Sequence, residues 1–209
     1  MAFNPPVIDD FNRAALGANY TNLAGTATIV ANQLAASVAP AVCVYTPESW
    51  VDAWAAMPIT TLPAVGTSTD LGVRVQNIGS VATLTGYAVR FNRNVGTDTL
   101  SIIRIDAPVT AVVLQTSNQE MGAGDWIGIR IYGTELSSWY KTGANPFTFV
   151  GSVIDATYSG AGDVSFTLPD TTIRVDQWNG GAYVPQPPQV RGNYIPGMQN
   201  YKRVKAGVL

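Results

Sequence analysis

Carboxylates are the side chains of this sequence best able to do chemistry, because histidine is absent and cysteine occurs once. Two carboxylates on either side of a glycosidic bond can hydrolyse it: one attacks the sugar or activates water, and the other donates a proton. The three glutamates are too far apart for two of them to share one strand; they are Glu48, Glu120 and Glu135. Folding could still bring two aspartates together, and the candidates are Asp52, Asp106, Asp155 and Asp163.

Other catalytic centres lack their essential residues. Without histidine there is neither a Ser-His-Asp triad nor a histidine metal site. The single Cys43 can form neither an internal disulfide nor a cysteine zinc site. No Gly-x-x-x-x-Gly-Lys-Ser/Thr phosphate loop occurs, and Gly122-Ala123-Gly124 is predicted to be a hairpin turn. We therefore predict no catalytic residues, no metal, no cofactor and no enzymatic activity.

Arginines and aromatic residues offer a binding chemistry instead. Five arginines fall at positions that strand alternation would point outward: Arg74, Arg90, Arg104, Arg130 and Arg174. Trp126 and Tyr132 share the parity of Arg130, so rings that stack on sugars and a bidentate donor would lie on one face. We hypothesise that Arg90, Arg130, Trp126 and Tyr132 bind an acidic or neutral glycan.

The alternative interpretation of these residues is structural, and the sequence favours it. Each arginine would pair with a cross-strand aspartate, for example Asp106 or Asp176, and would only fix strand register. The tryptophans would likewise be anchors in the core or at a subunit contact, where Trp50, Trp54 and Trp139 are the candidates.

The elements that would position these side chains are short strands. In residues 125–133, Ile127, Ile129 and Ile131 alternate with more polar or aromatic residues, which is typical of a strand with one buried face. The same period of two occurs in residues 70–78, 86–93, 101–106 and 171–178. Turns rich in Gly, Asn and Asp separate the runs, at 94–98, 121–124, 142–146 and 159–163. This pattern predicts an all-β antiparallel sandwich.

Residues 46–59 are ambiguous. Thr46-Pro47-Glu48 has the N-cap threonine and the first-turn proline of a helix start. We favour a strand over Ser49–Ile59, because the neighbouring segments are strand-like. Pro58 and Pro63 would then place the end of this strand at a sheet edge, since proline cannot donate to a central ladder.

The composition bounds the size and setting of the protein. Its 209 residues, 46% of them hydrophobic, suffice for one large all-β domain. Only 12% are charged, against about 25% in an average soluble protein. Such a surface is typical of a subunit covered by others, or of an extracellular β-protein with a neutral surface. Residues 1–6 lack the features of a secretory signal, and polar residues interrupt the apolar run 24–45, so no membrane contact is predicted.

The chain divides into an N-terminal arm (1–8), a β-sandwich domain (9–181) and a C-terminal arm (182–209). The C-terminal arm carries four basic and no acidic residues, and it mixes prolines with tyrosines. Dense proline favours extended chain, and the aromatics indicate an arm that orders against a partner or its own domain; a flexible linker is the alternative. Four charges make nucleic acid an unlikely partner, so protein docking is predicted. The docking residues would be Tyr183, Tyr194, Ile195, Met198, Tyr201, Lys202, Arg203 and Lys205.

Several segments, taken in order, resemble one fold family. Residues Asp9-Asp10-Phe11-Asn12-Arg13-Ala14, followed by the aromatic Tyr20, resemble the first strand of concanavalin A-like (laminarinase/lectin-type) jelly rolls. Later segments resemble its middle and closing strands, at 86–91, 102–105, 124–131, 159–164 and 173–181. The resemblance covers residues 9–181 and depends on the order of the segments, since no single motif is specific. It implies a two-sheet antiparallel jelly-roll sandwich with extended terminal arms.

The resemblance also bears on catalysis and calcium. Catalytic members carry a Glu-x-Asp-x-x-Glu strand, which this sequence lacks, so a non-catalytic scaffold is implied. Many such folds hold a calcium ion near the first and last strands, and Asp10 and Asp176 sit at matching ends of this chain. The favoured alternative is that Asp10 forms a turn and that Asp176 is an exposed strand residue.

Stand-alone domains of this pattern with short arms resemble bacteriophage virion proteins of the capsid decoration, minor tail and fibre types. The resemblance thus implies a structural protein of the particle surface, made in the host cytoplasm and released by lysis. Its partners would be capsid or tail subunits, further copies of itself and a host surface glycan. The alternatives are a dedicated glycan-binding adhesin or receptor-binding module and, third, a degenerate polysaccharide hydrolase.

Overall fold

The computed structural model describes residues 3–108 and 110–185. In this part of the chain every regular element is a strand, apart from the short 3-10 helix η1 (Val81–Thr83), which confirms the predicted all-β class. No helix within it is long and apolar enough to cross a membrane. The strands are β1 (Val7–Asp9), β2 (Tyr20–Val30), β3 (Gln33–Trp50), β4 (Ala53–Thr61), β5 (Ser68–Gln76), β6 (Thr85–Asn92), β7 (Thr99–Asp106), β8 (Thr110–Asn118), β9 (Asp125–Tyr132), β10 (Glu135–Lys141), β11 (Thr148–Ile154), β12 (Gly162–Leu168), β13 (Arg174–Val175) and β14 (Trp178–Ala182).

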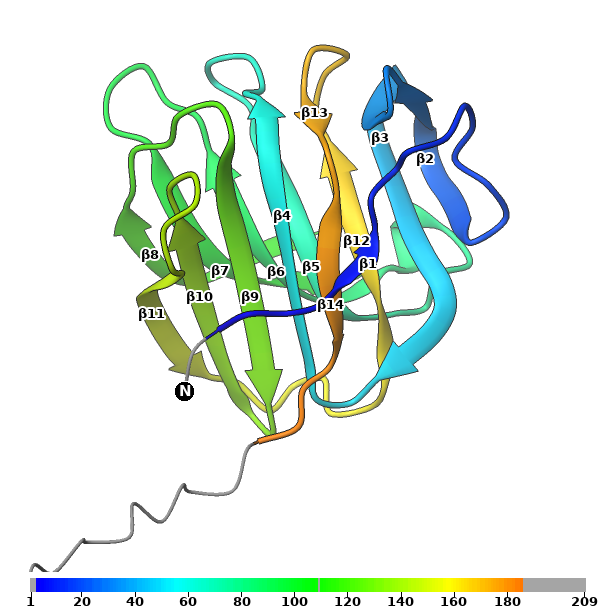
Figure 1. The fold of residues 1–209 in the computed structure, drawn as a ribbon. Coiled ribbons are helices and arrows are strands. Elements are labelled where there is room, and N and C mark those ends of the chain that lie inside the picture. The colour runs from blue at the N-terminus through cyan, green and yellow to red at the C-terminus, as the bar shows by residue number, and fades with distance from the viewer. Residues whose placement is uncertain (1–2, 109, 186–209) are drawn as a thin grey trace, which may run out of the picture.

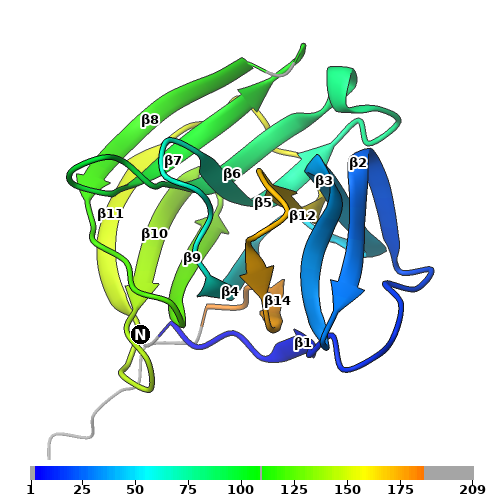
Figure 2. The ribbon, with the colours of Figure 1, turned by 90° about the horizontal axis from the view of Figure 1, so that it is seen from above.

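The strands form two layers. Their hydrogen-bonded order is β11-β10-β9-β4-β13-β3-β12-β5-β6-β7-β8, and the described pairs are antiparallel. This path folds over on itself, so that its two halves face each other (Figures 1 and 2). We call β4, β9, β10, β11 and β14 the front sheet, and β5, β6, β7, β8 and β12 the back sheet. The long strand β3 belongs to both, because Leu34 pairs with β13 whereas residues 41–50 pair with β12.

The inner faces of the two sheets make one core. Ile127, Ile129 and Ile131 of β9 are fully buried, as their alternation predicts. The same cluster contains Val89 and Phe91 of β6, on the opposite sheet. Each buried aliphatic side chain contributes about 1.5–3 kcal/mol relative to exposure, so this apolar layer is what holds the sheets together.

The ambiguous segment forms strands and no helix. β3 ends at Trp50 and β4 begins at Ala53, so a two-residue turn interrupts the expected continuous strand. The expectation that Pro58 lies at a sheet edge is wrong, because β4 runs between β9 and the pair β13/β14. On the latter side β14 pairs with residues 53–56 and β13 pairs from Ile59 onward, so Pro58 lies opposite the break between them.

Arg74 also departs from its prediction. Its backbone has a φ of +51°, within a bulge where the β5–β6 register shifts, and its side chain is only 1% exposed. The guanidinium donates to the carbonyls of Val51, Tyr158 (3.0 Å) and Gly133 (2.7 Å) and lies 3.4 Å from Asp52. Burial lowers the pKa of Arg74. Arg74 therefore links the β3–β4, β9–β10 and β11–β12 connections at one end of the sandwich and is not on an outer face.

The opening motif is a structural turn. The Asp9 carboxylate accepts the backbone N–H of Phe11 at 2.8 Å, and Arg13 donates to both of its oxygens at 2.6 and 2.7 Å. This turn drives the Phe11 ring fully into the core. The side-chain oxygen of Asp10 accepts the N–H of Asn12 at 3.0 Å.

Both ends of the described part of the chain lie against the front sheet. Residues 3–9 cross its outer surface and end in β1, which pairs with β14, so this strand spans the predicted arm boundary (Figure 1). The N–H of Gly180 donates to the carbonyl of Pro6 at 2.8 Å. At the other end β14 includes Ala182, and Tyr183 is buried against the sheet, so both residues belong to the body. The remaining predicted docking residues lie outside the described residues: Tyr194, Ile195, Met198, Tyr201, Lys202, Arg203 and Lys205.

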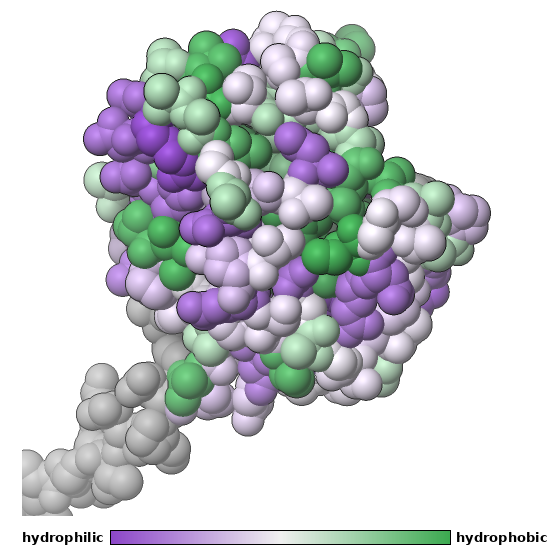
Figure 3. Space-filling model, turned by 90° about the vertical axis from the view of Figure 1, so that its right-hand side faces the viewer, coloured by the Kyte–Doolittle hydropathy of each residue, from purple (hydrophilic) through white to green (hydrophobic). Residues whose placement is uncertain are grey.

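The side of the molecule that carries β2 and β3 has a mixed surface. Figure 3 shows hydrophobic and hydrophilic residues interspersed there in small groups. Val30 and Val38, near the β2–β3 turn, are among its exposed apolar residues. Scattered apolar residues of this kind are normal on protein surfaces and do not mark a site.

Candidate functional site

The four predicted glycan-binding residues lie on two opposite faces of the sandwich. Trp126, Arg130 and Tyr132 project from β9 on the outer face of the front sheet, because the isoleucines between them fill the core. Arg90 projects from β6 on the outer face of the back sheet, because Val89 and Phe91 on either side are buried in the core. The structure therefore places three of the four on one face of the front sheet and Arg90 on the back sheet.

Arg90 forms a cross-strand ion pair, as the structural interpretation of the arginines predicts. It donates to both oxygens of its cross-strand partner Asp70, at 2.7 and 2.8 Å. The partner is thus Asp70, and neither Asp106 nor Asp176. The pair lies in a hollow of about 120 Å³ on the back sheet, whose lining comprises Val42, Asp70, Val81, Leu84, Arg90, Ile105, Ala111 and Thr167.

Arg104 gathers two of the candidate catalytic aspartates. It binds Asp106 and Asp155, each at 2.9 Å, while Tyr158 donates to Asp106 and Tyr87 donates to Asp155, each at 2.7 Å. Hydrogen bonds from Arg104 hold the pKa of Asp106 below its usual range. Burial raises the pKa of Asp155, but the N–H of Thr157, the Tyr87 hydroxyl and Arg104 outweigh it and bring that pKa to about 2. Both groups are ionised at neutral pH, whereas hydrolysis of a glycoside needs one protonated acid.

The other two aspartates have separate roles. Asp52 accepts the N–H of Gly133 at 2.8 Å beside Arg74. Asp163 accepts the Ser49 hydroxyl, and its burial raises its pKa. Within residues 3–108 and 110–185 no group of three or more carboxylate or cysteine side chains is arranged to hold a metal ion; Asp10 forms a turn, and Asp176 is exposed at the break between β13 and β14.

The outer face of the front sheet is rich in aromatic residues. Cross-strand register places Trp54 beside Arg130, Trp126 beside Lys141, and Gly128 beside Trp139. Because strands alternate, these side chains share one face. We call the following set the aromatic face: Phe3, Trp54, Trp126, Tyr132, Trp139, Phe147, Phe149 and Tyr183.

Phe3 lies at the centre of the aromatic face. Its ring stacks on Trp139 with centroids 5.0 Å apart and planes 12° apart, and it meets Trp54 and Phe147 edge to face. Gly128 makes room for it, since a Cβ at that position would come within 2.7 Å of the Phe3 ring. The N-terminal segment thus uses two of the predicted subunit-contact tryptophans within its own chain.

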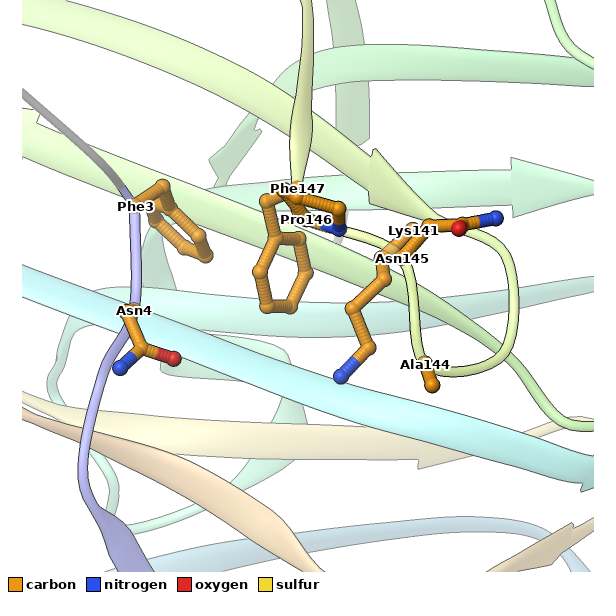
Figure 4. Close-up of a pocket in the computed structure, with 7 residues that line it drawn as sticks. All are labelled: Phe3, Asn4, Lys141, Ala144, Asn145, Pro146 and Phe147. Carbon is orange, nitrogen blue, oxygen red and sulfur yellow. The ribbon is translucent and has the colours of Figure 1, made fainter.

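A pocket of about 310 Å³ opens beside Phe3. It lies between the N-terminal segment and the β10–β11 loop, and its lining comprises Phe3, Asn4, Lys141, Ala144, Asn145, Pro146 and Phe147. Figure 4 shows Phe147 between Phe3 and Lys141, with Asn4 next to Phe3 on the N-terminal segment. The Lys141 ammonium lies 4.2 Å from the ring centroid of Trp126 and 5.2 Å from that of Phe147. The pocket therefore combines ring faces, two amides and one cation.

Arg130 and its cross-strand neighbour Trp54, whose ring meets Phe3 edge to face, carry buried donors on the aromatic face. Arg130 binds Glu135 at 3.1 Å, and its guanidinium lies 5.1 Å from the Tyr183 ring centroid. In the described part of the chain, its Nε and the Trp54 indole N–H are buried without a hydrogen-bond acceptor. Unpaired buried donors are uncommon in folded proteins, so each calls for a physical explanation.

The comparisons with known proteins place the fold. No protein-family model matches the chain, and no curated protein matches it significantly. The carbohydrate-binding module CBM66 from Bacillus subtilis superposes with a TM-score of 0.62 at 13% identity, over 78% of this chain and 96% of that one. The exoplasmic/lumenal domain of VIP36, in its Ca²⁺/Man-bound form, has a TM-score of 0.62 at 7% identity, over 81% of this chain and 85% of that one.

A phage protein is also similar in fold. The CBM2 module of the evolved Dit protein of Lactobacillus casei BL23 phage J-1 superposes with a TM-score of 0.57 at 9% identity, over 84% of this chain and 94% of that one. At such identities the likeness concerns the fold alone. The chain has the concanavalin A-like, lectin-type jelly-roll sandwich that its sequence resembles.

Sequence reasoning missed most of the pocket. Phe3, Asn4, Asn145 and Phe147 reach it from segments outside the alternating runs, so periodicity gives no signal for them. Lys141 was detectable, because it continues the alternation of Trp139 and is the single lysine before residue 202.

Proposed function

We propose that this protein is a non-catalytic carbohydrate-binding β-sandwich carried on a bacteriophage particle, with its sugar site on the aromatic face. The pocket beside Phe3 is the observation on which the proposal depends. Aromatic rings stack on the apolar faces of sugars, while amides and a cation serve their hydroxyl and acidic groups. Similarity in fold to a carbohydrate-binding module and to a lectin-type domain supports it.

The phage setting is supported by two further observations. The CBM2 module of a phage Dit protein is similar in fold to this chain over 94% of the module's length. The chain also carries only 12% charged residues, which suits a subunit partly covered by others. Docking through residues 186–209 to capsid or tail subunits belongs to the same proposal.

Binding can be tested on the purified full chain. We expect retention on a glycan array or on host cell walls, and loss of it in Trp126→Ala, which removes the ring beneath Lys141. The matched control is Trp50→Ala, since Trp50 stacks on Tyr45 and lies outside the aromatic face. Equal binding by both variants and the parent would place any sugar site elsewhere. Absence of binding by the parent would end the carbohydrate proposal.

Particle association is tested separately. A deletion should begin at residue 186, because removing Ala182 and Tyr183 would damage β14 and the aromatic face. We expect the shortened chain to fold and to be missing from assembled particles. Normal incorporation would refute docking by this segment. A protein that binds glycans but never sediments with particles would be a dedicated adhesin, and release of reducing sugar from host polysaccharide would indicate a hydrolase.

A further inference from the structure

We propose that the pocket beside Phe3 selects acidic saccharides, with Lys141 as the counter-charge of a sugar carboxylate. This inference rests on the proposed carbohydrate-binding function and names the substrate class of the same site. It follows from the charge, the geometry and the size of the pocket.

The charge of the pocket is unbalanced. Its seven lining residues include one cation and no carboxylate, and Lys141 forms no ion pair within the described residues. Asp125, next in sequence to Trp126, is occupied by the N–H of Gly122 (2.8 Å) and the hydroxyl of Tyr140 (2.7 Å). Five arginines, by contrast, each have a carboxylate within 4 Å: Arg13, Arg74, Arg90, Arg104 and Arg130.

The geometry fixes the position of this unpaired charge. The rings of Trp126 and Phe147 lie nearly perpendicular, at 87°, and both are within 5.2 Å of the Lys141 ammonium. Cation–π contacts of this kind contribute about 0.5–2 kcal/mol, and they restrict an otherwise flexible side chain. Figure 4 shows Lys141 extending into the space beside Phe147 and Ala144. An ammonium has three donors, so contact with two rings leaves donors for an anion in the pocket.

The remaining lining suits a sugar better than a simple anion. Asn4 and Asn145 are exposed amides, each able to donate to and accept from hydroxyl groups. Phe3 and Phe147 supply apolar walls. The volume of about 310 Å³ is at the lower end of ligand pockets, which favours one sugar unit or the end of a chain. A uronic or sialic acid unit matches all three properties, because it combines hydroxyls, an apolar face and a carboxylate.

Matched ligand pairs test this selectivity on the full chain. The probes are galacturonate with galactose, glucuronate with glucose, and N-acetylneuraminate with its methyl ester, measured by ligand-observed NMR titration. We expect the acid of at least one pair to bind at least tenfold more tightly than its neutral partner. That difference should shrink with added salt, because the contact is charged. Lys141→Gln should abolish it, and Lys141→Arg should keep part of it.

The control variant is Arg174→Gln, which removes a cation whose hydrogen bonds, among the described residues, go to the carbonyls of Thr171 and Ile173. It should leave the acid preference intact, and thermal unfolding should confirm that each variant folds. Neutral sugars that bind as well as the acids, or an acid preference that survives Lys141→Gln, would overturn the inference and leave the proposed function standing. Binding of no sugar, acidic or neutral, would instead count against the proposed function itself.

Discussion

Trp178 donates its indole N–H to the hydroxyl of Tyr20 at 2.7 Å, across 158 positions in the sequence. Tyr20 in turn donates to Asp9 at 2.7 Å, and Asp9 is held by Arg13. The chain of contacts joins the opening turn, β2 and β14 inside the core. The opening motif therefore joins the first and last strands of the domain.

Tyr20→Phe should lower the free energy of unfolding by about 1–3 kcal/mol, because it leaves the buried Trp178 donor unpaired and removes one donor from Asp9. Urea unfolding followed by tryptophan fluorescence measures the change. Tyr45→Phe is the control, because Tyr45 packs against the ring of Tyr20 but its hydroxyl makes no hydrogen bond among the described residues. Equal losses in the two variants would show that the hydroxyl network does not stabilise the fold.

Two aspartates should give opposite pH dependences. The folded pKa of Asp155 is about 2, below its ordinary 3.8, so its contribution to stability is present above pH 3.8 and is lost as pH falls toward 2. Asp155→Asn should therefore destabilise the protein at pH 7 and have little effect near pH 2. Burial raises the pKa of Asp163, so ionising it opposes folding at pH 7.

Asp163→Asn should accordingly stabilise the protein at pH 7, with the gain vanishing below the ordinary pKa of 3.8. It keeps an oxygen that can accept the Ser49 hydroxyl. Free energies of unfolding for both variants and the parent, measured in urea from pH 2 to 7, check the two signs together. Parallel curves for parent and variants would contradict both assignments.

Gly128→Ala should dislodge the N-terminal segment. The new Cβ would lie 2.7 Å from the Phe3 ring, so the ring must leave its stack on Trp139. We expect weaker sugar binding and greater proteolysis of residues 3–6, with a stability loss of about 1 kcal/mol, since Phe3 is a movable side chain. Gly79→Ala is the control, because a Cβ there meets nothing within 4 Å. An unchanged cleavage rate in Gly128→Ala would show that the glycine is not required for Phe3 to dock.

Alternation along strands gave the reliable part of the sequence prediction. Ile127, Ile129 and Ile131 are buried and Trp126 faces outward as expected, because each is set by local backbone geometry. The prediction that Arg74 points outward was wrong, because a bulge with positive φ reverses the direction of its side chain. The residue pattern gives no indication of such a bulge.

The site was harder to predict because it depends on which strands become neighbours. Arg90 and Arg130 have the same parity in similar runs, yet the fold places them on opposite sheets. Phe3 reaches the pocket from the segment whose strand β1 pairs with β14, a contact between the two ends of the domain. Sequence spacing contains neither relationship.

Arg90→Ala distinguishes the two faces of the sandwich. It leaves the Asp70 carboxylate, which is only 7% exposed, without its two charged donors. Removing one partner of a fully buried ion pair destabilises proteins by about 3–5 kcal/mol. Arg90 is partly exposed, so we expect a smaller loss of about 1–3 kcal/mol. Arg174→Ala, whose cation has no carboxylate partner in the described residues, should cost less than about 0.5 kcal/mol.

Sugar binding measured below the unfolding transition should be unchanged in Arg90→Ala, because Arg90 lies on the opposite sheet from the pocket. If binding falls while Trp126→Ala and Lys141→Gln retain it, the sugar site belongs to the hollow around Asp70 and Arg90 on the back sheet.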